Sequence, residues 1–374
     1  MPNKINVDED YFLLEAVKAG KESQVRSILS NSCYRNIDYV DCRGRTALHW
    51  ATEYGYKNII RLLLDSKWSA DLPDNKGQTP LHIACNHHKT DIATWLIGMG
   101  CDVNAKDDAG NAVLQRAIHN NLESVVHLLC KLDVGINSKN KNDWSPLHEA
   151  IRIGNKDIVR LLISKGADVN ALTQYKATPF STAIFYYRIA QKNSYGSLDS
   201  IGRTLVLNGG RLSESDGQWS PLLSCISIGN SYIAGMLLYH GCRVDKQGQH
   251  GRSLLVDAFT RCDTNVVKLL VTCGYRLTIE EVEQCTRRIP TFSRSFRRLA
   301  FSGHATGTNG VKMIVWLRER VHNCFSLQEL ARMTIRKSLN EGSGDRSILD
   351  NIPKLILPRV IKEYIAIDEI ENVY

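Results

Sequence analysis

A six-residue stretch, Gly77-Gln78-Thr79-Pro80-Leu81-His82, decides the fold of this chain because related stretches recur at a spacing of 33 residues. The neighbouring copies begin at Gly44, Gly110 and Asp143. Self-similarity at a period of about 20 to 50 residues is typical of architectures in which each repeat packs only on its neighbours. The sequence therefore predicts a stack of repeats instead of one closed core.

Each repeat carries the signals for two short helices. Thr79 before Pro80, and Ser145 before Pro146, place a capping side chain and a proline where a helix begins. Glycines then fall where each helix is expected to end in a left-handed turn. We assign Gly55, Gly154 and Gly229 to the ends of first helices, and Gly100, Gly166, Gly210, Gly241 and Gly274 to the ends of second helices. Two antiparallel helices and a turn are thus predicted for each repeat.

The repeats continue through most of the chain. A capping repeat spans residues 8–40, regular repeats span 41–73, 74–106, 107–139 and 140–172, and weaker ones extend to about residue 280. The sixth repeat has nine extra residues between Pro179 and Pro221, and such an insertion is expected to project from one face of the stack. Beyond residue 280 the period is lost, which indicates a domain boundary.

The C-terminal segment carries a second pattern. Ser326-Leu327-Gln328-Glu329 is a capping box, so a helix is predicted to start at Leu327. An apolar stripe follows at helical spacing, and it has to be buried against another surface. The stripe comprises Leu327, Leu330, Ala331, Ile335 and Leu339. A later element, Leu355-Ile356-Leu357-Pro358, ends in a proline that can open a last short helix.

These two patterns resemble known families. The period with its Thr-Pro-Leu-His stretch resembles the ankyrin repeat, and the C-terminal order resembles a SOCS box. In that box Leu, Cys and an aliphatic residue follow at intervals of four, as Leu327, Ala331 and Ile335 do here, and a Leu-Pro-aliphatic-Pro stretch comes later. Ala331 replaces the family's cysteine, and Ile356 stands where the family often has its first proline.

The resemblance to the ankyrin repeat and SOCS box family implies an all-α fold. We expect an ankyrin-repeat solenoid of about eight units over residues 8–280, a linker with bridging helices over 281–321, and a three-helix SOCS box over 322–367. It also implies a non-catalytic substrate-recognition adaptor of an elongin B/C, cullin-5 RING ubiquitin ligase. Elongin B and elongin C would meet the stripe Leu327, Leu330, Ala331, Ile335 and Leu339, and cullin-5 with its RING-box subunit would meet Leu355, Ile356, Leu357 and Pro358.

The ankyrin stack would then hold a protein substrate of unknown identity. Such stacks bind through the turn tips and the first helix of each repeat, and aromatic and arginine side chains dominate the energy of interfaces. At these positions lie Trp50, Tyr54, His87, Trp144, Arg152 and Trp219. A packing role within the stack is the alternative for each of them.

Other functions find little support in the sequence. We found no catalytic motif and no metal-ligand spacing, so neither an enzyme nor a cofactor is expected, and His49, His82 and His148 are interpreted as structural. The formal charge of +8 and the arginines of residues 287–298 favour acidic partners without requiring nucleic acid. The alternative hypothesis, based on Ala331 and Ile356, is an ankyrin scaffold whose terminal helices only cap the solenoid.

The location expected for this chain is intracellular. Its eleven cysteines include no closely spaced pair, which fits reduced thiols better than disulfides. No apolar run is long enough to span a membrane, and the start of the chain lacks the apolar stretch of a secretion signal. We therefore expect the cytoplasm, with the nucleus as a second compartment, and a role in intracellular signal transduction.

Overall fold

The computed structural model describes residues 7–30, 39–132, 134–189, 195–211, 220–242, 244, 253–288 and 308–322. This part of the chain is helical, and its only β-pairing is an isolated bridge between Lys106 and Ala112. The chain divides into two compact units, unit 1 (Met1–Ala177) and unit 2 (Thr178–Tyr374). The predicted SOCS-box helices lie outside the described residues.

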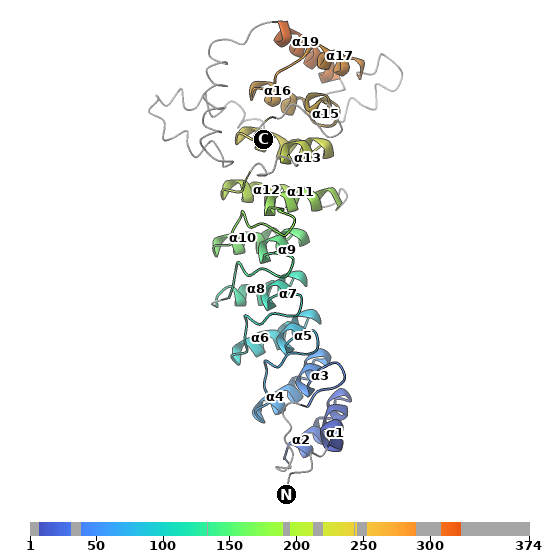
Figure 1. Ribbon diagram of the computed structural model, residues 1–374, viewed down its shortest axis with the longest axis vertical. Coiled ribbons are helices and arrows are strands. Elements are labelled where there is room, and N and C mark those ends of the chain that lie inside the picture. The colour runs from blue at the N-terminus through green and yellow to red at the C-terminus, as the bar shows by residue number, and fades with distance from the viewer. Residues whose placement is uncertain are drawn as a thin grey trace, which may run out of the picture. The chain divides into compact units, whose positions relative to one another are not determined.

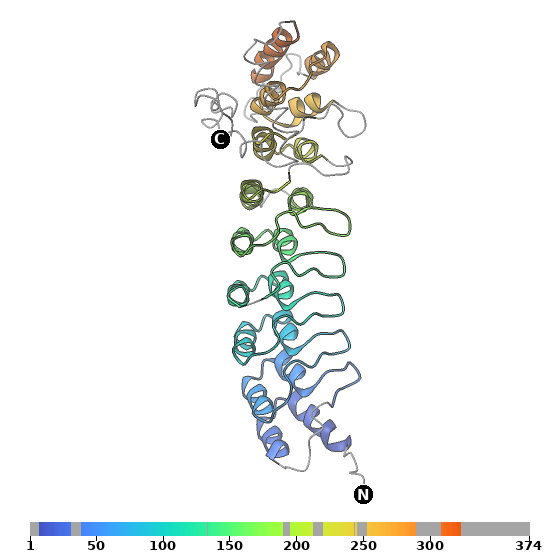
Figure 2. The same ribbon diagram turned by 60° about the vertical axis from the view of Figure 1, so that its left-hand side comes forward.

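Unit 1 contains five helix pairs. They are α1 (Val7–Lys18) with α2 (Glu22–Ser30), α3 (Ala47–Tyr54) with α4 (Lys57–Asp65), α5 (Pro80–Asn86) with α6 (Thr90–Gly98), α7 (Val113–His119) with α8 (Glu123–Leu129), and α9 (Pro146–Ile153) with α10 (Lys156–Ser164). The first helix of each pair packs on the first helix of the next (Figure 1). The loops that connect successive regular pairs all project to the same side (Figure 2). The predicted repeat is therefore confirmed throughout unit 1.

The period of 33 residues places equivalent side chains in the core and at the helix ends. Leu48, Leu81, Leu114 and Leu147 share one position in the first helices, and all four are fully buried. Gly55 and Gly154 end α3 and α9 in the left-handed conformation, with φ of 88° and 79°. Burial of one leucine per repeat and a fixed helix end explain why the register holds without slippage.

One predicted helix end is wrong. Gly100, Gly166, Gly241 and Gly274 have positive φ as expected, but after α12 (Tyr195–Leu207) the left-handed residue is Gly209, with φ of 81°, instead of Gly210. In each of these helices the left-handed glycine is the second residue after the last helical one. Because α12 ends at Leu207, the same geometry selects Gly209.

Unit 2 contains four further helix pairs. They are α11 (Pro179–Ile189) with α12, α13 (Pro221–Ile228) with α14 (Ser231–Tyr239), α15 (Leu254–Arg261) with α16 (Thr264–Thr272), and α17 (Ile279–Arg287) with α19 (Thr308–His322). The last pair continues the stack, since α17 packs on α15 and α19 packs on α16. In the described part of the chain, the five pairs of unit 1 and the three pairs of unit 2 that end with α16 make eight pairs. This number agrees with the predicted solenoid of about eight units.

Part of the insertion in the sixth repeat lies in two longer helices, and residues 190–194 between them lie outside the described residues. Helix α11 has 11 residues and α12 has 13, whereas α9 and α10 have 8 and 9. Both helices are therefore longer than their counterparts in the preceding repeat, and the projection expected from the insertion stays a prediction. Across all described helices of the chain, none combines the length and the apolar character needed to cross a membrane.

Candidate interaction surface

Buried polar side chains link each helix pair of unit 1 to the next. The backbone N–H of Thr46 donates to His49 Nδ1 (3.2 Å), and His49 Nε2 lies 2.9 Å from the carbonyl oxygen of Gln78 in the following pair. Because Nδ1 accepts a hydrogen bond, the neutral ring carries its proton on Nε2 and donates it to that carbonyl. His82 and His148 repeat the arrangement, with Nε2–oxygen distances of 3.3 and 3.2 Å to Asn111 and Ala177.

Gln115 makes the same bridge without a titratable ring. Its Oε1 accepts from the N–H of Ala112 (3.0 Å), and its Nε2 donates to the carbonyl of Trp144 (2.7 Å). Burial lowers the pKa of His49 and of His82, and it lowers the pKa of His148 to about 4, so these rings are neutral at pH 7. The three histidines are part of the stack, in line with their predicted structural role.

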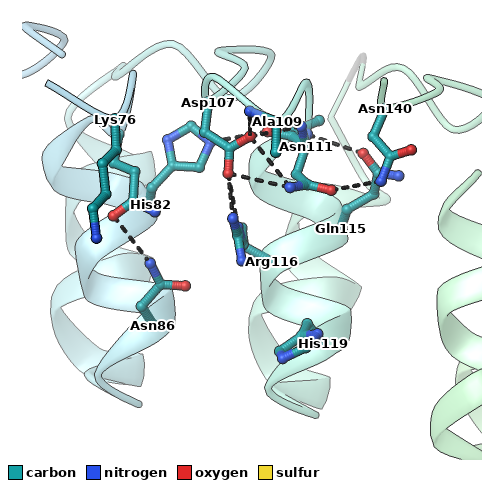
Figure 3. Close-up of polar contacts among 12 residues, drawn as sticks. Lys76, His82, Asn86, Asp107, Ala109, Asn111, Gln115, Arg116, His119 and Asn140 are labelled. Atoms are coloured by element: carbon teal, nitrogen blue, oxygen red, sulfur yellow. Dashed lines mark hydrogen bonds and ion pairs between the residues drawn. The ribbon is translucent and has the colours of Figure 1, made fainter. Parts of the chain in front are cut away.

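In each of the first three turns, a carboxylate accepts hydrogen bonds from backbone N–H groups of the same turn. Asp107 accepts hydrogen bonds from the N–H groups of Ala109 (3.0 Å) and Asn111 (2.8 Å) and from Arg116 Nε (2.9 Å), as Figure 3 shows. Burial opposes ionisation of Asp107, but the hydrogen bonds from Arg116 and Asn111 outweigh it and hold the pKa of this carboxyl below its usual value. Asp41 and Asp74 bind the equivalent N–H groups of their own turns.

Each turn also lies tightly against the next one. The N–H of Asp108 donates to the carbonyl of Lys76 (2.9 Å). Gly77, with φ of 69°, is required here because a Cβ atom would lie 2.7 Å from the backbone nitrogen of Asp108. The turn tips thus form a continuous edge along unit 1 beside the first helices.

An aromatic cluster covers the N-terminal end of this surface. The rings of Trp50 and Tyr54 stack with centroids 5.8 Å apart, and Tyr56 lies 5.7 Å from Tyr54. The indole N–H of Trp50 donates to Asp41 Oδ2 (3.0 Å), while Lys18 Nζ and Arg45 Cζ each lie 5.0 Å from a Trp50 ring centroid. These contacts fix the partly buried Trp50 in place, and Tyr54 beside it is 46% exposed.

A second, polar cluster lies between α7 and α9. Glu149 Oε1 is 2.7 Å from His119 Nδ1 and accepts from Arg152 Nη2 (2.6 Å). Closer to the aromatic cluster, Glu53 pairs with Arg45 and lies 3.8 Å from His87 Nε2. Glu53 and Glu149 are therefore each paired with an arginine and lie beside a histidine.

The structure brings some of the predicted contact residues together and separates others. The aromatic cluster contains Trp50 and Tyr54, whose rings stack. His87 lies beside this cluster, because it contacts Glu53, which pairs with Arg45. Arg152 belongs to the polar cluster. Trp144 packs against the ring of His148, with centroids 5.8 Å apart, at the start of α9. Trp219 lies outside the described residues, as do all the residues predicted to contact elongin and cullin. The roles of these side chains in binding stay predictions.

Several residues of this surface were not identified from the sequence. Lys18, Arg45, His119 and Glu149 take part in the two clusters, yet none was selected as a candidate. The period could have identified His119, because Glu53, Asn86, His119 and Arg152 occupy one position in successive repeats. Lys18 could not be identified in this way, because the capping repeat does not share the regular spacing.

The described residues of this surface carry side chains suited to contacts with another molecule. In the described residues no group of histidine, cysteine, aspartate and glutamate side chains could hold a metal ion. The described cysteines are free thiols, and burial raises the pKa of Cys85 and of Cys101 to about 12, so neither is a nucleophile at neutral pH. Aromatic, basic and paired acidic side chains remain, which are groups that recognise another molecule.

Comparison with protein-family models supports the same conclusion. The model for ankyrin repeats matches three times, over residues 13–107, 90–173 and 112–193, and the model for the SOCS box matches residues 323–366. No curated protein matches the chain significantly. The SOCS-box match contains both the predicted stripe that starts at Leu327 and the element that ends at Pro358. With both modules in this order, the chain belongs to the ankyrin repeat and SOCS box family.

Proposed function

We propose that this protein is the non-catalytic substrate-recognition subunit of an elongin B/C, cullin-5 RING ubiquitin ligase. Ankyrin repeats joined to a SOCS box indicate a substrate-receptor adaptor of a cullin–RING ligase, and the SOCS box implies binding to elongin B and C. The observation that carries the proposal is the SOCS-box match over residues 323–366, which begins directly after α19. Residues 8–280 would hold the substrate, and 281–321 would connect the two functions.

The energetics of the ligase side require more than one helix. Burial of the four larger aliphatic side chains of the stripe contributes about 6 to 12 kcal/mol, whereas association costs about 4 to 15 kcal/mol. The stripe of Leu327, Leu330, Ala331, Ile335 and Leu339 is therefore marginal by itself. Leu355, Ile356, Leu357 and Pro358 would add the contacts that bind the cullin.

The substrate side rests on the surface of unit 1. Its aromatic and polar clusters present rigid side chains at the first helices, and no catalytic group is needed for a subunit that only positions its target. We propose further that the protein acts in the cytoplasm, with the nucleus as a second compartment, in intracellular signal transduction. Imaging of the tagged chain in cells would test the location.

A pair of substitutions tests the ligase proposal. Leu327→Asp places a charge on the apolar stripe, and we expect it to abolish co-purification of elongin B and C from cells. Gln328→Asp adds the same carboxylate one residue later, off the stripe, and should retain elongin. Wild-type recovery of elongin with Leu327→Asp would contradict the proposal, and recovery of a cullin other than cullin-5 would contradict its choice of cullin.

The alternative is an ankyrin scaffold whose terminal helices only cap the stack. Ala331 and Ile356 favour it, because both depart from the SOCS-box pattern at contact positions. Under this alternative, deletion of residues 322–374 should lower the melting temperature of the repeats, and the intact chain should recover no ligase subunits. Under the ligase proposal the deletion removes elongin and leaves the melting temperature nearly unchanged.

A further inference from the structure

We propose that the N-terminal end of the unit 1 surface binds an acidic protein segment that carries a large aromatic or aliphatic side chain. This basic aromatic face comprises Lys18, Arg43, Trp50, Tyr54 and Lys76, from α1, α3 and the first two turn tips. The inference rests on the proposed function in substrate recognition and names the chemistry of the segment that is recognised.

The apolar part of the face is rigid and accessible. Tyr54 is 46% exposed, and its ring is fixed between Trp50 and Tyr56. On α1, the rings of Tyr11 and Phe12 are also exposed, at 51% and 60%, with centroids 6.2 Å apart. Rigid aromatic side chains lose little conformational entropy on binding, which makes them strong anchors at interfaces.

The carboxylates near this face are bound within the protein, whereas two of its basic side chains are available to a ligand. Asp41 and Asp74 are bound by the N–H groups of their own turns, and Glu53 is paired with Arg45. By contrast, the side chains of Arg43 and Lys76 have no hydrogen-bond or ion-pair partner in the described part of the chain. Figure 3 shows Lys76 directed away from Asp107, the nearest turn carboxylate drawn.

This excess of available positive charge is confined to the first two tips. The third and fourth tips have Ala109 and Asn142 at the position of Arg43 and Lys76. The third tip carries the exposed carboxylate of Asp108, and at the fourth tip the exposed Asp143 offsets the exposed Lys141. The gradient along the tips would direct carboxylates to the end where the aromatic rings lie, since opposite charges steer association.

A protein segment fits this face better than nucleic acid does. Nucleic-acid surfaces present many cations along the phosphate chain, whereas only Arg43 and Lys76 are available at the first two tips. A few separated carboxylates around one apolar side chain match the face more closely.

Fluorescent peptide pools test the inference on the full chain co-expressed with elongin B and C. Each pool has one central phenylalanine, tryptophan or leucine, flanked by random acidic, basic or uncharged polar residues, and single-stranded RNA of equal length is the fourth probe. We expect the acidic pool to bind most tightly. Lys76→Glu should weaken it about tenfold because it replaces attraction by repulsion, whereas Lys141→Glu, at the fourth tip, should leave it within about twofold.

A second pair of variants, Tyr54→Ala and its control Tyr175→Ala, tests the role of the exposed aromatic ring. Tyr54→Ala should weaken binding of the acidic pool about tenfold, while Tyr175→Ala, which removes an 80% exposed ring from the fifth tip, should not change it. Thermal melting of each variant establishes that it is folded. Equal losses in Lys76→Glu and Lys141→Glu, or equal losses in the two tyrosine variants, would overturn the inference.

Preference for another probe would also overturn it. The inference is wrong if no pool binds, if the basic or uncharged pool binds as tightly as the acidic one, or if RNA binds more tightly. Elongin recovery is measured on the same samples. Loss of elongin with intact peptide binding would contradict only the ligase proposal, and loss of peptide binding with intact elongin would contradict only this inference.

Discussion

The two units stack helix pairs in the same order, but the third residue of their first helices differs. In unit 1 this position holds His49, His82, Gln115 and His148, each of which bridges to a backbone carbonyl of the following pair. In unit 2 it holds Ser181, Leu223, Val256 and, in α17, Glu281, whose carboxylate accepts from the Ser253 hydroxyl at the start of α15 (2.6 Å). Ser181 bonds within its own helix start, to the carbonyl of Thr178 (2.9 Å), and Val256 is buried among apolar side chains.

The difference shows two ways to join repeats. A bridge from an imidazole or amide to a carbonyl in the next pair needs a fixed distance, so it holds the spacing of 33 residues through unit 1. Apolar contacts are less directional. Unit 2, which relies more on them at this position, contains the lengthened helices α11 and α12. Four comparisons of variants and conditions test this distinction.

The largest effect is expected from the apolar core of unit 2. Phe259 in α15 is fully buried, so Phe259→Ala should cost about 3 to 5 kcal/mol of unfolding free energy. Phe185→Ala removes the same ring from α11, where it is 56% exposed, and should cost less than about 0.5 kcal/mol. Urea denaturation followed by circular dichroism measures both losses. Similar losses would show that burial is not what holds unit 2 together.

The next effect concerns acid stability in unit 1. Burial lowers the pKa of His148 from 6.5 to about 4 and also lowers the pKa of His49 and of His82. Between pH 6.5 and about pH 4, His148 binds a proton in the unfolded chain but not in the folded one. Stability that is present above pH 6.5 is therefore lost as the pH falls. His148 alone should remove about 3 kcal/mol by about pH 4. Urea midpoints measured across this pH range check the loss.

Gln115 provides the control for acid stability. A variant with His49→Gln, His82→Gln and His148→Gln places the existing amide bridge at all four positions, and an amide does not titrate in this range. Its stability should decline less between pH 7 and pH 4 than that of the wild type. Parallel declines would mean that other groups, and not the bridges, determine the acid sensitivity.

A smaller effect follows from a single bridge. His82→Leu leaves the N–H of Thr79 and the carbonyl of Asn111 without their partner, and buried unsatisfied groups of this kind cost about 1 to 3 kcal/mol. His82→Gln should cost less than about 1 kcal/mol, since an amide can make both hydrogen bonds. Urea denaturation at neutral pH compares the two variants. Equal losses of unfolding free energy in the two variants would show that the loss of imidazole packing, and not the loss of its hydrogen bonds, causes the destabilisation.

The smallest effect concerns the helix ends of unit 1. His88 has φ of 55° at the position that Gly55 and Gly154 occupy in other repeats. His88→Gly should therefore raise stability by about 0.5 to 1 kcal/mol, because the left-handed conformation strains residues with a Cβ atom. Gly154→Ala, whose Cβ atom would meet no other atom within 4 Å, should lower it by a similar amount. Thermal melting resolves both changes, and a shift of the same sign in both would contradict this account.

Local signals predicted most of the fold. Thr79-Pro80 and Ser145-Pro146 mark helix starts, and Gly55 and Gly154 mark helix ends, because capping and left-handed turns depend on only a few neighbouring residues. The insertion was harder to place. Whether extra residues project or extend a helix depends on what the neighbouring pair can pack against, and the spacing of Pro179 and Pro221 contains no information on that.

The interaction surface was predicted less completely than the fold. Trp50 and Tyr54 were selected by residue type and repeat position, and they do lie together. Their partner Lys18 comes from α1, so that contact exists only once the pairs are stacked, whereas Arg45 lies in the turn directly before α3. The polar cluster of His119, Glu149 and Arg152 forms for the same reason, by juxtaposition of α7 and α9.

The sequence by itself determined the repeat, most of its helix ends and the family, because each depends on residue types at fixed spacings along the chain. Only the tertiary structure decided which charges are available. Asp41, Asp74 and Asp107 look like free carboxylates in the sequence, but folding binds them to the N–H groups of their own turns. Among the described residues the side chains of Arg43 and Lys76 acquire no such partner, since folded proximity and not chain order determines which charges are neutralised.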